Sequence, residues 1–119
     1  MEIRLKRVYE QADPADGYRV LVDRLWPRGV SKDSARLEEW NKEVAPSTEL
    51  RRRFSHDPGR FDRFRADYIE ELRDAGPALS ELRRRGSEGT LTLLYAAKNE
   101  KQNHAMVLAD VLRNGLSGA

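Results

Sequence analysis

One short apolar run limits the fold of this chain more than any other feature. Residues 90–97 read T-L-T-L-L-Y-A-A, a stretch rich in strand-forming residues and apolar enough to be covered on both faces. A polar stretch, 98–102, follows, and residues 103–114 then carry apolar side chains at helical spacing before Gly115. A buried strand, a polar loop and an amphipathic helix in this order form half of a βαβ unit. The run therefore predicts a parallel sheet.

An earlier segment has the same character. Residues 18–23, Y-R-V-L-V-D, contain three successive apolar residues, which suits a strand covered on both faces. Residues 3–8, I-R-L-K-R-V, alternate imperfectly and predict an edge or half-exposed strand. Pro14 and Gly17 lie between the two segments and predict a turn there.

The middle of the chain reads as helices with recognisable starts. Ser47 is suited to cap a short helix, and Asp57 followed by Pro58 predicts the start of a longer one. The Gly76-Pro77 pair breaks or kinks the longer helix, and a further helical piece runs to a predicted stop at Gly86. The apolar face of the longer helix is formed by Phe61, Phe64, Tyr68 and Leu72.

Residues 36–44 are compatible with two structures. Leu37, Trp40 and Val44 fall on one stripe of a helix, whereas the same residues also suit a short strand after a turn capped by Ser31. We predict a short helix near 31–35 followed by a short extended segment, and the helical alternative stays open.

These segments together predict an α/β fold, a small and mostly parallel sheet flanked by helices. A chain of 119 residues has the size of one domain and can bury one compact core. We find no linker, internal repeat or low-complexity tract, so we expect a single domain over residues 1–119.

Basic side chains follow two strands of the predicted sheet. The stretch V-D-R-L-W-P-R-G, residues 22–29, brings Arg24 and Arg28 after the earlier strand, and Lys98 follows the last one. If the two strands are central neighbours, these groups meet at their carboxyl ends, where ligands of open α/β sheets bind. Arginine forks, a lysine and a helix start suit an anion. The predicted ligand-binding residues are Arg24, Arg28, Lys98, Asn103 and His104.

The function predicted from this pocket is binding of a small molecule or nucleotide that bears a phosphate or carboxylate, with or without a reaction on it. A structural alternative has equal standing. Asp23 could pair with Arg24, Arg28 or Lys98 in a buried ion network, while Trp26 plugs the core.

Few side chains are suited to catalysis. The chain has no cysteine, which excludes thiol nucleophiles, and its two histidines are far apart in sequence, so we expect no metal site. No phosphate-loop or dinucleotide-binding motif is present, and we expect no cofactor. The candidates for catalytic residues are His56, His104 and Tyr68, although Asp57 beside His56 is better explained as a helix cap. Whether the chain is an enzyme stays open.

The charge balance gives only weak support for a nucleic-acid partner. The formal net charge is +2, from 22 basic and 20 acidic residues. The arginine runs 51–53 and 83–85 read as solvated helix faces, because successive helical residues point in different directions. A nucleic-acid-binding domain without catalysis, or a homo-oligomeric module that uses Trp40 and the aromatic helix, is therefore an alternative function.

The expected location is the cytoplasm. No apolar run approaches the ~20 residues that a membrane span requires. Met1 leads directly into I-R-L-K-R-V, without the apolar core of a signal peptide. We therefore expect no membrane partner.

Four motifs in order resemble the YeaO-like branch of the domain-of-unknown-function 488 (DUF488) family over nearly the whole chain. They are V-D-R-L-W-P-R-G, A-P-S-T-E-L-R, F-S-H-D-P, and L-T-L-L-Y-A-A-K-N followed by N-H-A. The resemblance implies a compact bacterial α/β domain and supplies no reaction, because the family is uncharacterised. More distant members look to carry a Cys-His-Arg type signature where this chain has Asn103-His104-Ala105. Only His104 corresponds, so thiol chemistry is not carried over.

Overall fold

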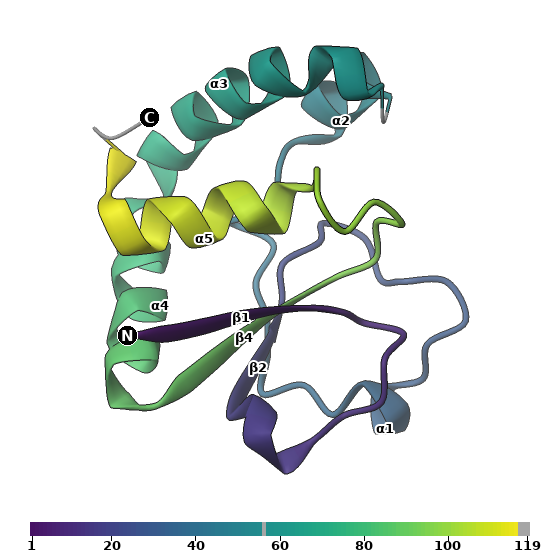
Figure 1. Cartoon of the computed structure of the whole chain (residues 1–119), viewed down its shortest axis with the longest axis vertical. Helices are drawn as coiled ribbons and strands as arrows, with labels where there is room; N and C mark the ends of the chain where they lie inside the picture. Colours follow the sequence, from purple (N-terminus) through teal and green to yellow (C-terminus); the bar gives the residue numbers. More distant parts are fainter. Residues whose placement is uncertain (56, 117–119) are drawn as a thin grey trace.

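The structure, a computed structural model, describes residues 1–55 and 57–116. Within them, one sheet of four parallel strands has the order β1-β4-β2-β3 (Figure 1). The strands are β1 (Glu2–Arg7), β2 (Tyr18–Leu21), β3 (Glu39–Trp40) and β4 (Thr90–Tyr95). The predicted α/β fold is confirmed, and β1 is the edge strand that its alternating sequence indicated.

The two apolar segments lie beside each other in the middle of the sheet. Val20 of β2 pairs with Leu93 of β4, and Leu21 pairs with Leu94. Because side chains alternate along a strand, Val20 and Leu93 face one side of the sheet, and Leu21 and Leu94 face the other. All four are fully buried, so both faces of the central strands are covered.

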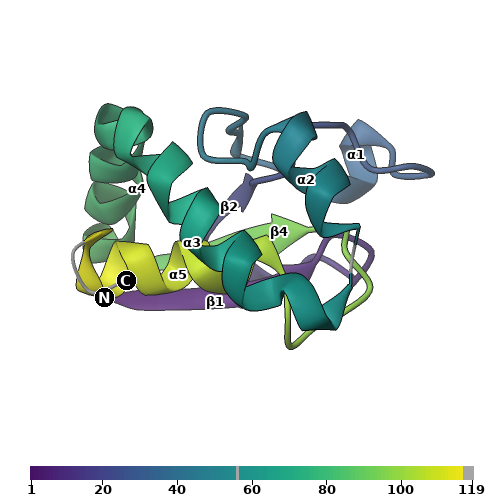
Figure 2. The same ribbon diagram turned by 90° about the horizontal axis from the view of Figure 1, so that it is seen from above.

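The long helices cover one face of the sheet. In Figure 2, α3 and α5 lie side by side, and Figure 1 shows α4 beside the start of β1. No helix in the described ranges is both long enough and apolar enough to span a bilayer. The helices are α1 (Lys32–Ala35), α2 (Thr48–Phe54), α3 (Phe61–Leu72), α4 (Gly76–Glu88) and α5 (His104–Asn114), with short 3-10 turns η1 (Pro14–Asp16), η2 (Pro58–Arg60) and η3 (Arg73–Ala75).

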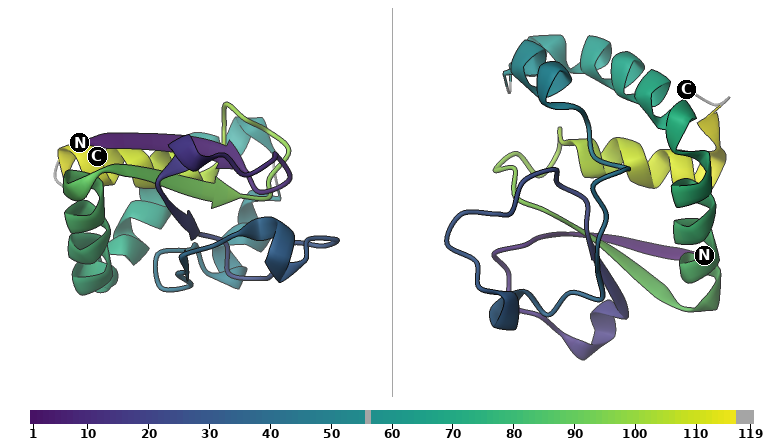
Figure 3. Two further views of the ribbon diagram at one scale, coloured as in Figure 1. Left: turned by 90° about the horizontal axis from the view of Figure 1, so that it is seen from below. Right: turned by 180° about the vertical axis from the view of Figure 1, so that it is seen from behind.

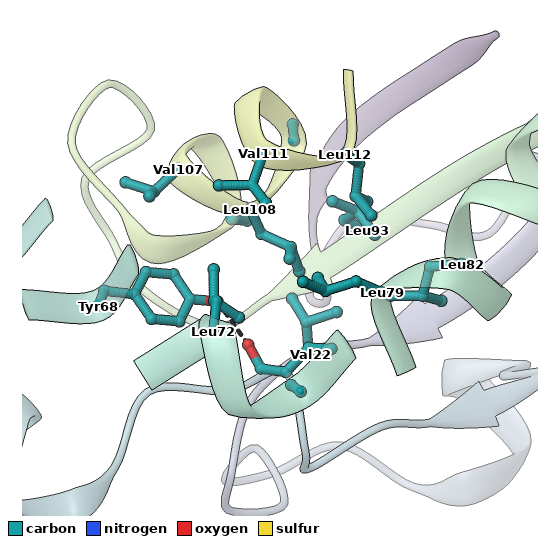
Figure 4. Packing of buried hydrophobic residues seen from close by; sticks show 14 of the residues in the cluster. Val22, Tyr68, Leu72, Leu79, Leu82, Leu93, Val107, Leu108, Val111 and Leu112 are labelled. Carbon is teal, nitrogen blue, oxygen red and sulfur yellow. Dashed lines mark hydrogen bonds between the residues drawn. The ribbon is translucent and has the colours of Figure 1, made fainter. Parts of the chain in front are cut away.

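The main core lies between the helices and the sheet. Figure 4 shows Leu72 of α3, Leu79 of α4 and Leu108 of α5 converging toward Leu93. Each of these side chains is at most 1% exposed. The helical spacing of apolar residues in the sequence therefore corresponds to one continuous buried layer.

The opposite face is covered by loops, η1 and the short helix α1. The right view of Figure 3 shows α1, in dark blue, on the side of the sheet away from α3 and α5. A smaller cluster forms there around Leu21 and Leu94. Trp26 meets Trp40 edge to face, with ring centroids 5.3 Å apart. The prediction that helices flank the sheet is thus confirmed, but the helices are distributed unequally. The long helices α3, α4 and α5 lie on one face, and the other face has the short helix α1 and loops.

The segment that had two interpretations, 36–44, contains the short strand β3 and no helix. Ser31 caps α1 by accepting a hydrogen bond from the backbone N–H of Ser34, as predicted. The chain then pairs with β2, because Glu38 N–H donates to Arg19 O and Asn41 N–H donates to Leu21 O, each at 2.9 Å. The helical alternative for 36–44 is therefore wrong, and hydrogen bonding to the sheet decides the outcome.

One predicted helix end is also wrong. The helix α4 continues through Gly86 and ends at Glu88. A Cβ atom at Gly86 would lie 3.0 Å from Cγ of Met1. The glycine therefore marks a close contact between α4 and the start of the chain instead of a helix stop.

A buried ion network joins η1 to the sheet. Asp16 accepts hydrogen bonds from Lys6 and Arg19, and its residue is only 3% exposed. Arg19 also donates to Ala35 O, at 2.8 Å from Nη2. Burial alone would raise the pKa of Asp16, but the hydrogen bonds from the Asp13 N–H, Lys6 and Arg19 outweigh it, so its pKa is lowered.

We predict that Asp16→Asn lowers the free energy of unfolding at pH 7 by about 3 kcal/mol, because it leaves the buried Arg19 without its charge partner. Since the folded-state pKa of Asp16 is lowered, its stabilisation is present above the unfolded-state pKa and is lost as the pH falls through the folded value. The difference between variant and parent should therefore shrink below about pH 4. Urea unfolding at pH 7 and pH 3 measures both effects.

The matched control is Glu2→Gln, which breaks an exposed pair with Arg4. Such pairs contribute about 0–1 kcal/mol, so this variant should unfold nearly as the parent does. Equal stability of the Asp16 and Glu2 variants at pH 7 would contradict the role given to the buried network.

Candidate functional site

A cavity of about 520 Å³ opens at the carboxyl ends of β2 and β4. Parallel α/β sheets place their ligand sites at this edge. Its walls are partly apolar, with three cationic side chains and one carboxylate around them. Among the described residues the lining is formed by Asp23, Arg24, Pro46, Arg51, Ala96, Ala97, Lys98, Asn99 and His104.

Asp23 fixes the ends of the two central strands relative to each other. Its Oδ2 accepts a hydrogen bond from Ala96 N–H at 3.0 Å, across from β2 to the end of β4. Its backbone carbonyl accepts a hydrogen bond from Nε1 of Trp40 at 2.7 Å. The carboxylate therefore has a defined position in the floor of the cavity.

His104 begins α5 and lies against Asp23. Its Nε2 is 3.0 Å from the carbonyl oxygen of Val22 and 2.9 Å from Oδ1 of Asp23. Both neighbours are acceptors, so Nε2 carries the proton. The N–H is aligned with the Val22 carbonyl, and Oδ1 is within ion-pair distance without good hydrogen-bond geometry. This buried oxygen has no hydrogen-bond partner among the described residues.

Arg24 holds one wall of the cavity in place. Its Nε donates to Pro46 O and its Nη2 to Ala45 O, each at 3.1 Å. These bonds fix the guanidinium and the segment before α2 together. The remaining nitrogen, Nη1, makes no hydrogen bond with any described residue, so one edge of the fork is available to a ligand.

Two more cations complete the rim. Arg51 belongs to α2, which Ser47 caps. The hydroxyl of Ser47 also donates a hydrogen bond to Glu71 of α3 at 2.6 Å, which ties the start of α2 to α3. Lys98 follows β4. Both Arg51 and Lys98 are exposed, and neither has an acidic side chain within ion-pair distance in the described ranges. They are free to approach an anion.

The structure brings some predicted site residues together and separates others. Arg24, Lys98 and His104 lie around the cavity. Arg28 does not line it in the described structure, because the chain turns away through Pro27 and Trp26 Nε1 closes the loop onto Val30 O at 2.6 Å. Asn103 is 2% exposed and caps α5 by accepting from Met106 N–H, so its side chain serves the helix.

Of the remaining catalytic candidates, Tyr68 is described by the structure. His56 lies outside the described residues. Tyr68 is fully buried, and its hydroxyl donates to Val44 O. Burial raises the pKa of Tyr68 well above its usual range, and the negative charges of Asp23 and Glu71 add to the effect. Its ring and the His104 ring make an edge-to-face contact with centroids 6.2 Å apart, so Tyr68 helps to hold the histidine in place.

Sequence reasoning did not select Arg51 for the site. Arg51, Arg52 and Arg53 are consecutive on a short helix, and their order alone does not say which one faces the sheet edge. The sequence signal that could have identified it is the Ser47 cap, which fixes where α2 begins. Arg51 lies one helical turn after this cap, on the same face of α2.

We predict that Tyr68→Phe lowers the free energy of unfolding by about 1–2 kcal/mol, because it leaves the buried Val44 carbonyl without its donor. Thermal or urea unfolding measures this loss. Tyr9→Phe is the control, since Tyr9 is 48% exposed and its hydroxyl bonds to Arg28 O at the surface. If both variants were as stable as the parent, the structural role of the Tyr68 hydroxyl would be disproved.

Comparison with known proteins gives consistent relatives. The family model described as "Inactive DUF488-N3 subclade" matches residues 2–118. The uncharacterised protein YeaO of Escherichia coli (strain K12) is 50% identical over 117 residues, which are 96% of this chain and 99% of that protein. The uncharacterised protein Rv3073c of Mycobacterium tuberculosis (strain H37Rv) is 49% identical over 110 residues, 92% of each chain.

A third relative, the uncharacterised protein Mb3100c of Mycobacterium bovis, is likewise 49% identical over 92% of each chain. No solved structure matches this chain. The family match spans nearly all of the sequence, and the relatives align over almost their whole lengths. This chain therefore belongs to the DUF488 family, as a YeaO-like member.

Proposed function

We propose that this protein binds a small anionic molecule that bears a phosphate or carboxylate, a nucleotide included, in the cavity at the carboxyl ends of β2 and β4, and that it does so without covalent catalysis. The observation that carries the proposal is the guanidinium of Arg24, fixed by two backbone carbonyls in a cavity that Arg51 and Lys98 also line. A fixed donor fork needs little ordering when an anion arrives.

The charge and shape of the cavity support this ligand class. Among the described residues, three cationic side chains line it against one carboxylate, Asp23, whose Oδ2 accepts a hydrogen bond from the N–H of Ala96. Pro46, Ala96 and Ala97 give an apolar wall that suits the organic part of a ligand. A volume of about 520 Å³ falls within the range of small-molecule pockets.

Binding without covalent chemistry is consistent with the described lining of the cavity, which contains no hydroxyl or thiol side chain. The nearby Ser47 hydroxyl is engaged with Glu71 and with the N–H of Leu50 as the cap of α2. The description of the matched family model as an inactive subclade is consistent with this proposal.

The alternative functions have less support. Arg84 pairs with Glu81 and Glu88, and Arg83 donates to carbonyls at the end of α5, so the run 83–85 does not offer a free basic surface. The aromatic side chains of Phe64 and Tyr68 are in the core, where a second subunit does not reach them. Nucleic-acid binding, self-association and a cytoplasmic location stay predictions.

We predict that inorganic phosphate and nucleoside monophosphates raise the melting temperature of the protein in a thermal-shift assay. At 100-fold excess over Kd the stabilisation is about 2.7 kcal/mol. Arg51→Ala and Lys98→Ala should each weaken binding about tenfold, because each removes one charged hydrogen-bond donor. The same anions should shift the melting of Arg28→Ala as much as that of the parent.

Arg28→Ala is a matched control, because it removes an exposed arginine away from the cavity. An equal loss in all three variants would point to nonspecific charge effects and contradict the proposed site. Filter binding of single-stranded and duplex DNA at low and high salt tests the competing function. Retention that falls steeply with salt, without any effect of phosphate on melting, would replace the proposal with nucleic-acid binding.

A further inference from the structure

The ring of His104 has one nitrogen bonded inside the protein and one without a hydrogen bond to any described residue. Its Nε2–H is held between the carbonyl of Val22 and the carboxylate of Asp23. Its Nδ1 makes no hydrogen bond with any described residue, and it is not among the enclosed polar atoms of the structure. Because His104 lines the cavity, Nδ1 is the ring nitrogen that a ligand can reach.

The two protonation states of this ring present opposite groups to an anion. In the neutral ring Nδ1 is an acceptor, whose lone pair repels an anionic oxygen. In the imidazolium Nδ1–H is a donor with a full positive charge. Histidine changes between these states near neutral pH. An anion in the cavity therefore has a much better contact with His104 after the ring takes up a proton.

Charged and polar groups surround the ring. Asp23, at the end of β2, has its Oδ1 2.9 Å from Nε2, and Tyr68 of α3 contacts the ring as a neutral phenol. Arg24, Arg51 and Lys98 line the same cavity and oppose a further positive charge while it is empty. A bound anion reverses their effect by neutralising them. Ligand binding and protonation of His104 therefore favour each other, as thermodynamic linkage requires.

We propose that His104 is a ligand-contacting residue that takes up a proton when an anion binds, and that Asp23 is the positioning residue that holds its ring for this contact. The inference rests on the proposed function and deepens it. It assigns the ligand a group that accepts a hydrogen bond from Nδ1–H, as a tetrahedral oxyanion or a carboxylate does. It also gives the cavity an affinity that rises as the pH falls.

Sulfate is the probe for the test, because it does not titrate near neutral pH and any proton taken up must go to the protein. Isothermal titration calorimetry at pH 5.5 and pH 8 measures its affinity, and two buffers of different ionisation enthalpy measure proton uptake. We expect binding about tenfold tighter at pH 5.5 than at pH 8. Between these pH values, complex formation should take up a fraction of one proton.

Variants assign the proton to a side chain. His104→Gln should keep residual sulfate binding through the arginines and lose both the pH dependence and the proton uptake. His56→Gln, at the other histidine of the sequence, should keep both. In Asp23→Asn the ring loses the carboxylate beside Nε2 that holds it, so sulfate should bind more weakly at pH 5.5 than it binds to the parent. The NMR titration of the His104 ring in the parent, with and without sulfate, gives the same information without relying on a variant that folds.

The outcomes separate this inference from the proposed function. Sulfate binding without proton uptake, or uptake that persists in His104→Gln, overturns the inference and leaves anion binding intact. Absence of sulfate binding at pH 5.5 also overturns it, since a cavity with a protonated histidine should hold a tetrahedral dianion. The proposed function fails separately, if neither phosphate nor any nucleotide shifts the melting temperature.

Discussion

The pairing of β2 with β4 is the interaction on which the rest of the structure depends. These two strands are buried on both faces, and both hydrophobic clusters of the described residues pack against them. Their alignment is extended past the last paired residues by the N–H of Val22, which donates to Leu94 O, and by Asp23, which accepts from Ala96. The same carboxylate thereby fixes the floor of the cavity and places His104.

Most of the architecture could be predicted from the sequence, because the apolar pattern of the strand segments and the capping residues of the helices are local signals. Residues 18–23 and 90–97 are rich in apolar and strand-forming residues, which favours central strands, and Ser31 and Ser47 mark helix starts through side-chain caps, which depend only on neighbouring residues. The extent of α4 was less accessible. Gly86 does not end the helix. A side chain at this position would come close to Met1, which is far away in sequence, and such a contact cannot be recognised from the local sequence.

The candidate site was predictable only in part, for a related reason. Strand order and direction place Arg24 and Lys98 at one edge once β2 and β4 are recognised as neighbours. The direction of a side chain after a turn is not set by strand order, and Arg28 follows Pro27 into a loop that Trp26 closes on Val30. Arg51 lines the cavity because of how α2 packs in the folded protein. Three consecutive arginines in the sequence do not show which of them will face the cavity. Asn103 was selected for the cavity and serves instead as a cap.

The two hydrogen bonds from Arg24 to the carbonyls of Ala45 and Pro46 change how substitutions in related chains should be interpreted. An arginine at this position is needed to hold the backbone even in a relative that has lost its ligand. Finding an arginine at this position in a relative is therefore evidence for the same fold and not, by itself, evidence for ligand binding. The side chains of Arg51 and Lys98 hold no backbone carbonyl in the described structure, so under the proposed function these two positions should vary first in relatives that do not bind the anion.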